Sequence, residues 1–286
     1  MKSADTRQRF LFDTTHIRGE ITTLCSSFQE MQSRQNYPPA VNAMLGEFLA
    51  AASLLSATLK FSGIVSIQAI GRGAIKTIMA ECSNKTQLRG IVRGDFSAVA
   101  EQQGFQSLLE SATLAITIEP EGKERYQGIV PIESETLSGC LEHYFAQSEQ
   151  LSTKIKLAAN QETAAGVLIQ QMPHGKDDKK AKDNWQHLAV LVDSLKPEEQ
   201  LTLSHEEQLY RLFHEQNLRL LEAEHVQFFC SCSKYRTAKT LTSLGFEEVN
   251  QICQQQGSLQ ITCEFCDRQY MFDKSDICNL FEREDT

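Results

Sequence analysis

The stretch FFCSCSKYRT (residues 228–237) decides the fold of the C-terminal part, because it places Cys230 and Cys232 only one residue apart. A second close pair, Cys263 and Cys266, begins after thirty intervening residues. Each pair can present two thiols from one local turn, and two such pairs are typical of a four-cysteine zinc site. We therefore expect these four cysteines to bind one Zn²⁺ ion.

Two other interpretations of the paired cysteines stay open. Cys253, Cys278 or His225 could replace one of the four ligands, although packing or surface roles are more typical of such residues. The zinc could also be purely structural, because residues 230–286 offer only a modest apolar core. A segment this small usually needs a metal or another staple to fold.

The charge of this segment argues against a zinc module that binds nucleic acid. Residues 230–286 contain six Lys or Arg and nine Asp or Glu, which gives a net charge of −3. Four thiolates around one Zn²⁺ add a further −2. A negatively charged domain repels phosphates, so we expect no nucleic-acid partner.

The same cysteines suit a redox switch. Zinc holds its cysteine ligands as thiolates, which are the form that oxidants attack. Zinc-bound sulfurs lie roughly 3.8 Å apart, whereas disulfide sulfurs lie about 2.05 Å apart, so sulfurs that form disulfides no longer bind the metal. Loss of the metal removes a folding contribution of about 10–16 kcal/mol. Loop closure favours Cys230–Cys232 and Cys263–Cys266 bridges over bridges across the gap. Such small rings cannot hold the domain together as the metal does, so we expect oxidation to unfold it. Small strained disulfide rings are easily reduced, so we expect the unfolding to be reversible.

Composition limits what the remaining chain does. The 286 residues are 41% hydrophobic and carry a net charge of −9 without a basic block, which argues against nucleic acid or an anionic membrane as partner. The N-terminus lacks an apolar secretory segment, and the most apolar window, residues 44–61, contains a glutamate and is typical of a core helix. We therefore expect the protein to be cytoplasmic. The cytoplasm keeps thiols reduced, so clustered cysteines there are more typical of metal ligands or redox groups than of structural disulfides.

Residues 1–173 predict an α+β domain with a mostly antiparallel sheet and packed helices. A helix is expected after Pro38 and Pro39, and a second over residues 135–151. Residues 10–30 fit either strand or helix. Alternating apolar residues predict strands and hairpins over residues 64–70, 74–81, 87–94, 113–132, 153–160 and 164–173.

Residues 174–226 predict a charged boundary followed by a metastable helical linker. Trp185, Leu188, Val192 and Leu195 form one apolar stripe. Ser204 and Glu207 fit a capping box ahead of a second apolar helix face formed by Leu209, Leu212 and Phe213. Helices this short are marginal in water, so they must dock on another surface. We expect that docking to be conditional, and residues 227–286 to form the zinc-binding switch domain.

The cysteine pattern resembles the redox-regulated heat-shock protein 33 family of bacterial holdase chaperones, and the resemblance spans nearly the whole chain. The matching motifs are IRGE (17–20), LLSATLKF (54–61), RYQGIV (125–130), LEHYFAQSEQL (141–151) and VLIQQMP (167–173). Asp267 departs from the pattern, because a small residue such as glycine is commoner after the last ligand. Cys253 and Cys278 are also unusual and could divert oxidation into other disulfides.

The resemblance implies an α+β core, a metastable linker and a C-terminal zinc switch that keeps the reduced chaperone inactive. Under oxidants, especially with heat, both cysteine pairs would form disulfides, zinc would leave and the linker would unfold. The protein would then bind unfolding client proteins without ATP, and activated members are associated with homodimers. Client binding would fall on residues 180–226 and the adjoining surface of the core.

Two rival functions remain at this point. One is a thiol–disulfide oxidoreductase that uses the C-x-x-C pair, although no thioredoxin-like βαβ unit surrounds Cys263. The other is a constitutive binding module with structural zinc, which would protect clients equally in both redox states. We expect a chaperone and not an enzyme.

Overall fold

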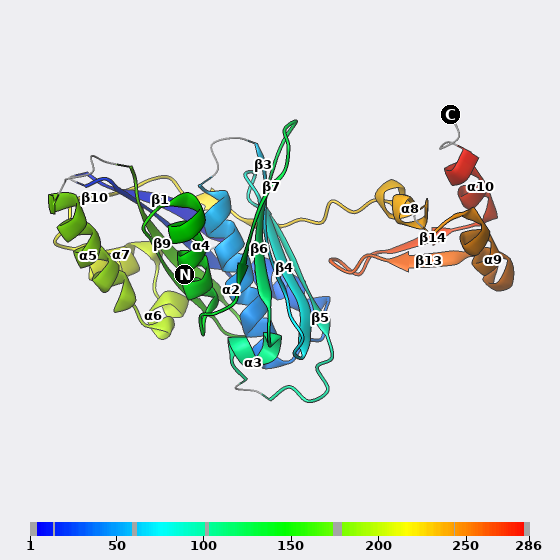
Figure 1. Ribbon diagram of the computed structural model, residues 1–286, viewed down its shortest axis with the longest axis horizontal. Helices are drawn as coiled ribbons and strands as arrows, with labels where there is room; N and C mark the ends of the chain where they lie inside the picture. Colours follow the sequence, from blue (N-terminus) through cyan, green and yellow to red (C-terminus); the bar gives the residue numbers. More distant parts are fainter. Residues whose placement is uncertain are drawn as a thin grey trace. The chain divides into compact units, whose positions relative to one another are not determined.

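The computed structural model describes residues 5–13, 15–58, 62–100, 103–173, 179–242 and 244–282. The chain divides into two compact units, Met1–Phe229 and Cys230–Thr286. The first unit contains two six-stranded sheets and most of the helices, and the second contains a two-stranded sheet and three helices (Figure 1). This arrangement confirms the predicted α+β class with antiparallel sheets.

The first sheet of the larger unit is antiparallel throughout, with strand order β10-β1-β2-β9-β8 and β11 paired to β1. Its strands are β1 (Thr6–Phe12), β2 (Ile17–Leu24), β8 (Thr153–Ala159), β9 (Ala164–Gln171), β10 (Leu218–Leu220) and β11 (Glu224–His225). The ambiguous segment at residues 10–30 therefore contributes strand β2 and then helix α1 (Ser26–Ser33). The predicted hairpin over residues 153–173 is confirmed as β8–β9.

The second sheet has the order β12-β5-β4-β3-β6-β7, and only the β12–β5 pair among its described strands is parallel. Its strands are β3 (Gly63–Ile70), β4 (Ile75–Ser83), β5 (Gln87–Gly94), β6 (Thr113–Pro120), β7 (Tyr126–Pro131) and β12 (Gln227–Phe228). All the strands predicted between residues 64 and 132 are confirmed. Three short strands were not predicted, because two or three residues carry no recognisable alternation. Strands β10 and β11 lie at the end of the predicted linker (residues 174–226), and β12 follows it.

Helix α2 (Pro39–Ser56) forms the core of the unit and contacts strands of both sheets (Figure 1). Its last carbonyls are capped by arginines of β1, because Arg7 Nη1 donates to Ser53 O at 3.1 Å and Arg9 donates to Ala57 O. Among the described helices, α2 alone is long and apolar enough to cross a membrane, but 72% of that window is buried inside the structure. This burial is typical of a core helix.

The remaining helices of this unit lie at the ends of the sheets or on their faces. The predicted helix over residues 135–151 is observed as α4 (Leu137–Tyr144) followed by a π-helical turn, η1 (Phe145–Glu149). A short helix, α3 (Phe105–Leu109), precedes β6. Three further helices follow β9: α5 (Lys179–Asp193), α6 (Pro197–Thr202) and α7 (His205–Phe213).

Helices α5 to α7 pack on the face of the first sheet that points away from α2. We call this contact the linker dock; its buried residues are Phe10, Phe12, Ile17, Ile21, Val167, Ile169, Leu188, Val192, Leu195, Leu209, Leu212 and Phe213. Both apolar stripes predicted for the linker lie within it. The capping box is also confirmed, because Ser204 Oγ accepts from Glu207 N at 3.2 Å and Glu207 Oε2 accepts from Ser204 N at 2.9 Å.

Polar contacts fix the position of the linker helices on the sheet. Gln200 Nε2 of α6 donates to Lys156 O of β8 at 3.1 Å, and Lys154 Nζ of β8 lies 2.8 Å from Asp193 Oδ1 at the end of α5. Gln171 Nε2 donates to Ala181 O of α5 at 3.1 Å. A partly exposed ion pair and single hydrogen bonds contribute little each, so burial of the apolar stripes supplies most of the docking free energy.

Candidate metal centre

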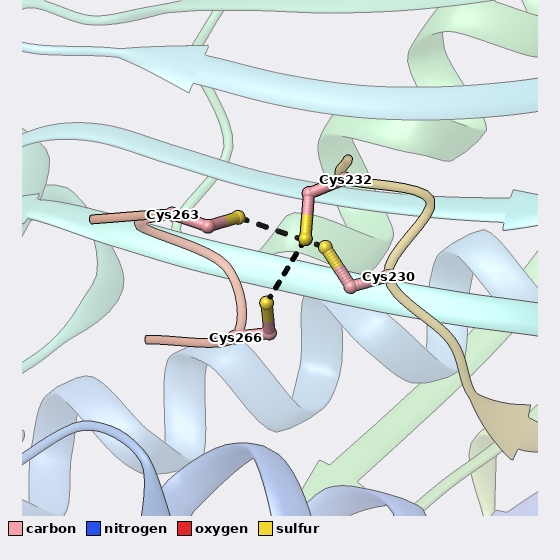
Figure 2. Close-up of side chains that lie close together, drawn as sticks. All are labelled: Cys230, Cys232, Cys263 and Cys266. Carbon is pink, nitrogen blue, oxygen red and sulfur yellow. Dashed lines mark hydrogen bonds between the residues drawn. The ribbon is translucent and has the colours of Figure 1, made fainter. Parts of the chain in front are cut away.

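The smaller unit brings the four predicted cysteines to one point from two separate segments. Cys230 and Cys232 lie just before α8 (Lys234–Thr242), whereas Cys263 follows β13 (Leu259–Thr262) and Cys266 lies in the turn before β14 (Gln269–Phe272). Figure 2 shows the four side chains converging. All four sulfurs lie within 4.8 Å of one another, with 3.7 Å between Cys230 Sγ and Cys263 Sγ and 3.3 Å between Cys232 Sγ and Cys266 Sγ.

A tight turn between β13 and β14 positions the second cysteine pair. Cys263 N donates to Arg268 O and Asp267 N donates to Cys263 O, both at 2.8 Å. Asp267 adopts a left-handed backbone with φ of 57°. Glycine enters this region at no steric cost and aspartate tolerates it better than most residues, which explains how Asp267 occupies a position where glycine is commoner.

A small apolar core supports the cluster. The buried residues of this core are Ala238, Leu241, Val249, Cys253, Leu259, Phe272 and Ile277. They come from α8, α9 (Phe246–Gln256), the β13–β14 hairpin and α10 (Lys274–Glu282). Seven buried side chains are few for an independent unit, so the four-sulfur cluster is well placed to supply the missing stability.

The three possible substitute ligands lie outside the four-sulfur cluster. Cys253 is 3% exposed in the apolar core, with its sulfur 3.8 Å from Gly257 O. Cys278 is half-buried on α10. His225 belongs to β11 of the larger unit, where its Nδ1 lies 3.0 Å from Asp5 O. Within the described ranges, the group of metal-binding side chains therefore contains the four paired cysteines alone.

The environment shifts the pKa values of Cys230, Cys232 and Cys266 in different directions. Burial raises the pKa of Cys230 and of Cys266. Burial would also raise the pKa of Cys232, but hydrogen bonds from Tyr270 and from the neighbouring thiols outweigh it and lower that pKa to about 7. The lowered pKa means that Cys232 is readily held as a thiolate, which is the form that binds metal.

Tyr270 is a residue of the site that the cysteine pattern alone does not reveal. Its hydroxyl donates to Cys232 Sγ at 3.1 Å, because residue 270 of β14 faces the first cysteine pair. An O–H donor to a sulfur ligand orients the ligand and tunes its basicity. The only signal in the sequence is the position of Tyr270 four residues after Cys266, where Tyr270 and Phe272 alternate with polar or flexible residues.

The donor set fits a soft or borderline metal ion. Four sulfurs arranged within 4.8 Å match the spacing of roughly 3.8 Å that tetrahedral Zn–S geometry requires, with small adjustments of the side chains. Hard cations such as Mg²⁺ and Ca²⁺ prefer oxygen ligands, and the cluster contains none. The cluster could therefore hold a metal ion of the zinc type.

Comparison with known proteins gives a consistent result over the whole chain. Residues 5–273 match the family described as Hsp33 protein. The 33 kDa chaperonin of Pseudomonas aeruginosa (strain LESB58) is 44% identical over 284 residues, covering 98% of this chain and 96% of the relative. The 33 kDa chaperonin of Pseudomonas fluorescens (strain SBW25) is 40% identical and covers 98% and 95%.

A solved structure shares the fold. The crystal structure of the 33 kDa chaperonin (heat shock protein 33 homolog) from Thermotoga maritima superposes with a TM-score of 0.85 at 18% identity, covering 98% of this chain and 99% of that one. The relatives are named as chaperonins and not as enzymes, which does not favour the oxidoreductase alternative. With the family match over residues 5–273, these findings show that the chain belongs to the Hsp33 family of chaperones.

Proposed function

We propose that this protein is a redox-regulated, ATP-independent holdase that binds unfolding client proteins after oxidation of its C-terminal cysteines. The convergence of four sulfurs within 4.8 Å, in a chain of the Hsp33 family, carries the proposal. In the reduced state Cys230, Cys232, Cys263 and Cys266 would bind one Zn²⁺, which supplies the bonds that hold residues 227–286 folded. We place the protein in the cytoplasm, without nucleic-acid or membrane partners, and expect a homodimer in the activated state.

The switching step is a four-electron oxidation of the cysteine cluster. Two thiolates give up two electrons when they form one disulfide, so two disulfides release four electrons. Two molecules of a peroxide accept these electrons together with protons from the solvent, and each is reduced to two molecules of water or to one alcohol and one water. Each sulfur then shares one electron pair in an S–S bond and is neutral, so the four thiolate donors are lost.

The proposed pairing joins Cys230 with Cys232 and Cys263 with Cys266. All four sulfurs lie within 4.8 Å, so proximity in the folded state alone does not select the partners, and the 3.3 Å contact from Cys232 to Cys266 favours the rival cross-pair bridge. Loop closure favours neighbours once the unit loosens. Bridges within each pair leave the two segments unlinked, which is why oxidation would unfold the unit.

The proposed consequence for the rest of the molecule is release of the linker. We divide the chain into a core (residues 1–173), a linker (174–226) and the switch domain (227–286). Undocking of α5 to α7 would expose the apolar face of the first sheet together with the apolar stripes of the helices. A large newly exposed apolar surface is what binding of unfolding proteins requires. The charged outer faces of these helices would keep the released segment soluble.

The test is to treat the reduced, zinc-loaded protein with hydrogen peroxide at mildly elevated temperature. We expect release of one zinc ion per chain, detected with a chromophoric chelator, and two disulfides within the cysteine pairs, assigned by mass spectrometry. Light scattering of a thermally unfolding client should be suppressed by the oxidised protein alone, and a dithiol should reverse the effect. Equal protection by both redox states, or a folded unit with cross-pair disulfides, would contradict the proposal.

Tyr270→Phe should weaken metal binding and speed oxidation, because it removes the hydroxyl that donates to Cys232 Sγ at 3.1 Å. Loss of a hydrogen bond to a ligand typically lowers metal affinity roughly 10–100-fold. We expect a decrease of about 10-fold in zinc affinity in a competition titration, and faster zinc release by peroxide. Tyr235→Phe is the matched control, since Tyr235 of α8 is exposed in the same unit. Equal affinities for both variants would exclude a role for the Tyr270 hydroxyl.

A further inference from the structure

A buried histidine lies in the linker dock. His205 is the first residue of α7 and is 3% exposed. Its Nδ1 lies 2.6 Å from Gln8 Oε1 of β1, and its Nε2 lies 3.0 Å from Thr23 Oγ1 of β2. Both ring nitrogens are therefore engaged by the sheet on which the linker helices pack.

The hydrogen bonds require a neutral ring of one tautomer. Gln8 Nε2 donates to Leu221 O at 3.2 Å, which turns Gln8 Oε1 toward the ring. An amide oxygen only accepts, so the proton of the neutral ring lies on Nδ1. Nε2 then accepts from the Thr23 hydroxyl. A second proton on Nε2 would remove this hydrogen bond and place a charge inside the dock.

Among the described residues, the elements next to His205 bring no charged group that would stabilise a protonated ring. Arg7 and Arg9 of β1 lie on the opposite face of the sheet, where they cap α2. Glu206 and Glu207 of α7 are exposed, and Glu207 is bound to Ser204. Gln8 and Thr23, the ring's partners from β1 and β2, are uncharged.

Further groups near His205 also fail to stabilise its protonated form. The carboxylate of Asp5, which precedes β1, accepts from Cys25 N and Ser27 Oγ. The positive end of the α7 dipole disfavours a cation at the first helical position. Burial accordingly lowers the pKa of His205 to about 4.

We propose that protonation of His205 releases the linker helices, so that acidification is a second signal for this chaperone and acts while all four C-terminal cysteines remain reduced. The docked linker accepts only the neutral ring, whereas the undocked linker exposes the ring to water and accepts a proton at ordinary acidity. Binding of clients by the acid-released linker rests on the proposed function, but the release itself does not.

The sign and size of the effect follow from the two pKa values. The docked ring titrates near pH 4 and an exposed histidine near 6.5. The contribution of His205 to the docking free energy is therefore fully present above pH 6.5 and decreases as the pH falls. It is lost below pH 4. Between pH 7.5 and pH 5, the equilibrium constant for undocking should rise roughly 25-fold.

Three buried or half-buried carboxyl groups of the core respond to acid in the opposite direction. Burial raises the pKa of Glu47 to about 7, and burial also raises the pKa of Glu20 and of Glu142. A carboxyl whose pKa is raised in the folded state favours folding more as the pH falls. At pH 5 these three groups therefore stabilise the folded core, while protonation of His205 destabilises the linker dock. The linker should accordingly be released at a pH at which the core remains folded.

The experiment is amide hydrogen exchange of α5 to α7 in the reduced, zinc-loaded protein at pH 7.5 and pH 5, corrected for intrinsic exchange rates. We expect protection of these helices to fall roughly 25-fold at pH 5. Emission of Trp185, the single tryptophan of the chain, gives a second readout, because it lies half-buried against the linker dock. Zinc retention is measured in parallel with a chromophoric chelator.

Three variants separate titration of the ring from a structural role. His205→Gln should remove the pH dependence even if it weakens docking at both pH values. Gln8→Glu should strengthen docking at pH 5 relative to wild type, because a carboxylate beside Nδ1 favours the protonated ring. His187→Gln, on the exposed face of α5, should keep the wild-type response.

The inference fails if wild-type protection changes less than threefold between the two pH values. It also fails if His205→Gln loses protection at pH 5 as wild type does, or if protection falls only in parallel with loss of zinc. Loss of protection without any client binding at pH 5 would instead contradict the role of the linker in the proposed function, and would leave acid release of the helices intact.

Discussion

Replacing Cys266 with serine is expected to unfold the C-terminal unit under reducing conditions. Cys266 is 6% exposed and its sulfur lies 3.3 Å from that of Cys232, so the variant loses one of four converging donors. A serine hydroxyl is a poor zinc ligand, and structural zinc contributes about 10–16 kcal/mol to folding. The apolar core of the unit is too small to make up this loss.

Zinc content, hydrogen exchange of residues 230–282 and client light scattering check this prediction. The variant should contain little zinc, exchange rapidly and suppress client aggregation without any oxidant. Cys278→Ser is the matched control, because Cys278 is a half-buried thiol of the same unit outside the four-sulfur cluster. A Cys266→Ser protein with a protected, folded C-terminal unit would show that the metal is not essential there.

Phe213→Ala is expected to release the linker while zinc stays bound. Phe213 is 2% exposed, and its ring centroid lies 5.0 Å from that of Phe12 and 6.0 Å from that of Phe10. Truncating a buried phenylalanine costs about 3–5 kcal/mol. This cost falls on the contact between α7 and the first sheet, so we expect client binding by the reduced protein.

The control for this variant lies on the same helix. Tyr210→Ala removes an aromatic ring that is 72% exposed and should leave docking unchanged. The measurements are hydrogen exchange of α5 to α7, zinc content and client light scattering in a reducing buffer. If Phe213→Ala undocks the helices but does not bind clients, linker release is insufficient for chaperone activity, and the proposed mechanism must be revised.

Much of the fold could be predicted because its strands carry clear patterns. Alternating residues from Ile64 to Ile132 and from Thr153 to Gln171 gave the hairpins that the structure contains. The segment at residues 10–30 remained ambiguous, because Ile17 and Ile21 fit a helical spacing as well as a strand. Both residues are buried under the linker helices, which is a tertiary contact. A local pattern shows that a face is apolar but does not show which element packs against it.

The candidate site divides in the same way. The paired spacing of the four cysteines predicted that they converge, because each pair lies in one turn and a tetrahedral zinc site needs four sulfur donors. Tyr270 contacts Cys232 across 37 intervening residues, and His205 meets Gln8 across almost the entire larger unit. Such contacts depend on how the elements pack, which spacing along the chain does not reveal.

The short strands that follow α7 would limit how far helices α5 to α7 could move on release from the sheet. Strands β10 and β11 pair with β1, and β12 pairs with β5, so the chain is anchored to both sheets soon after α7. The preceding strand, β9, is anchored between β2 and β8. With these strands in place, released helices α5 to α7 would form a loop that is fixed at both ends. The released helices would stay at high local concentration near the first sheet. They would compete there with a bound client and would dock again quickly once the client had left.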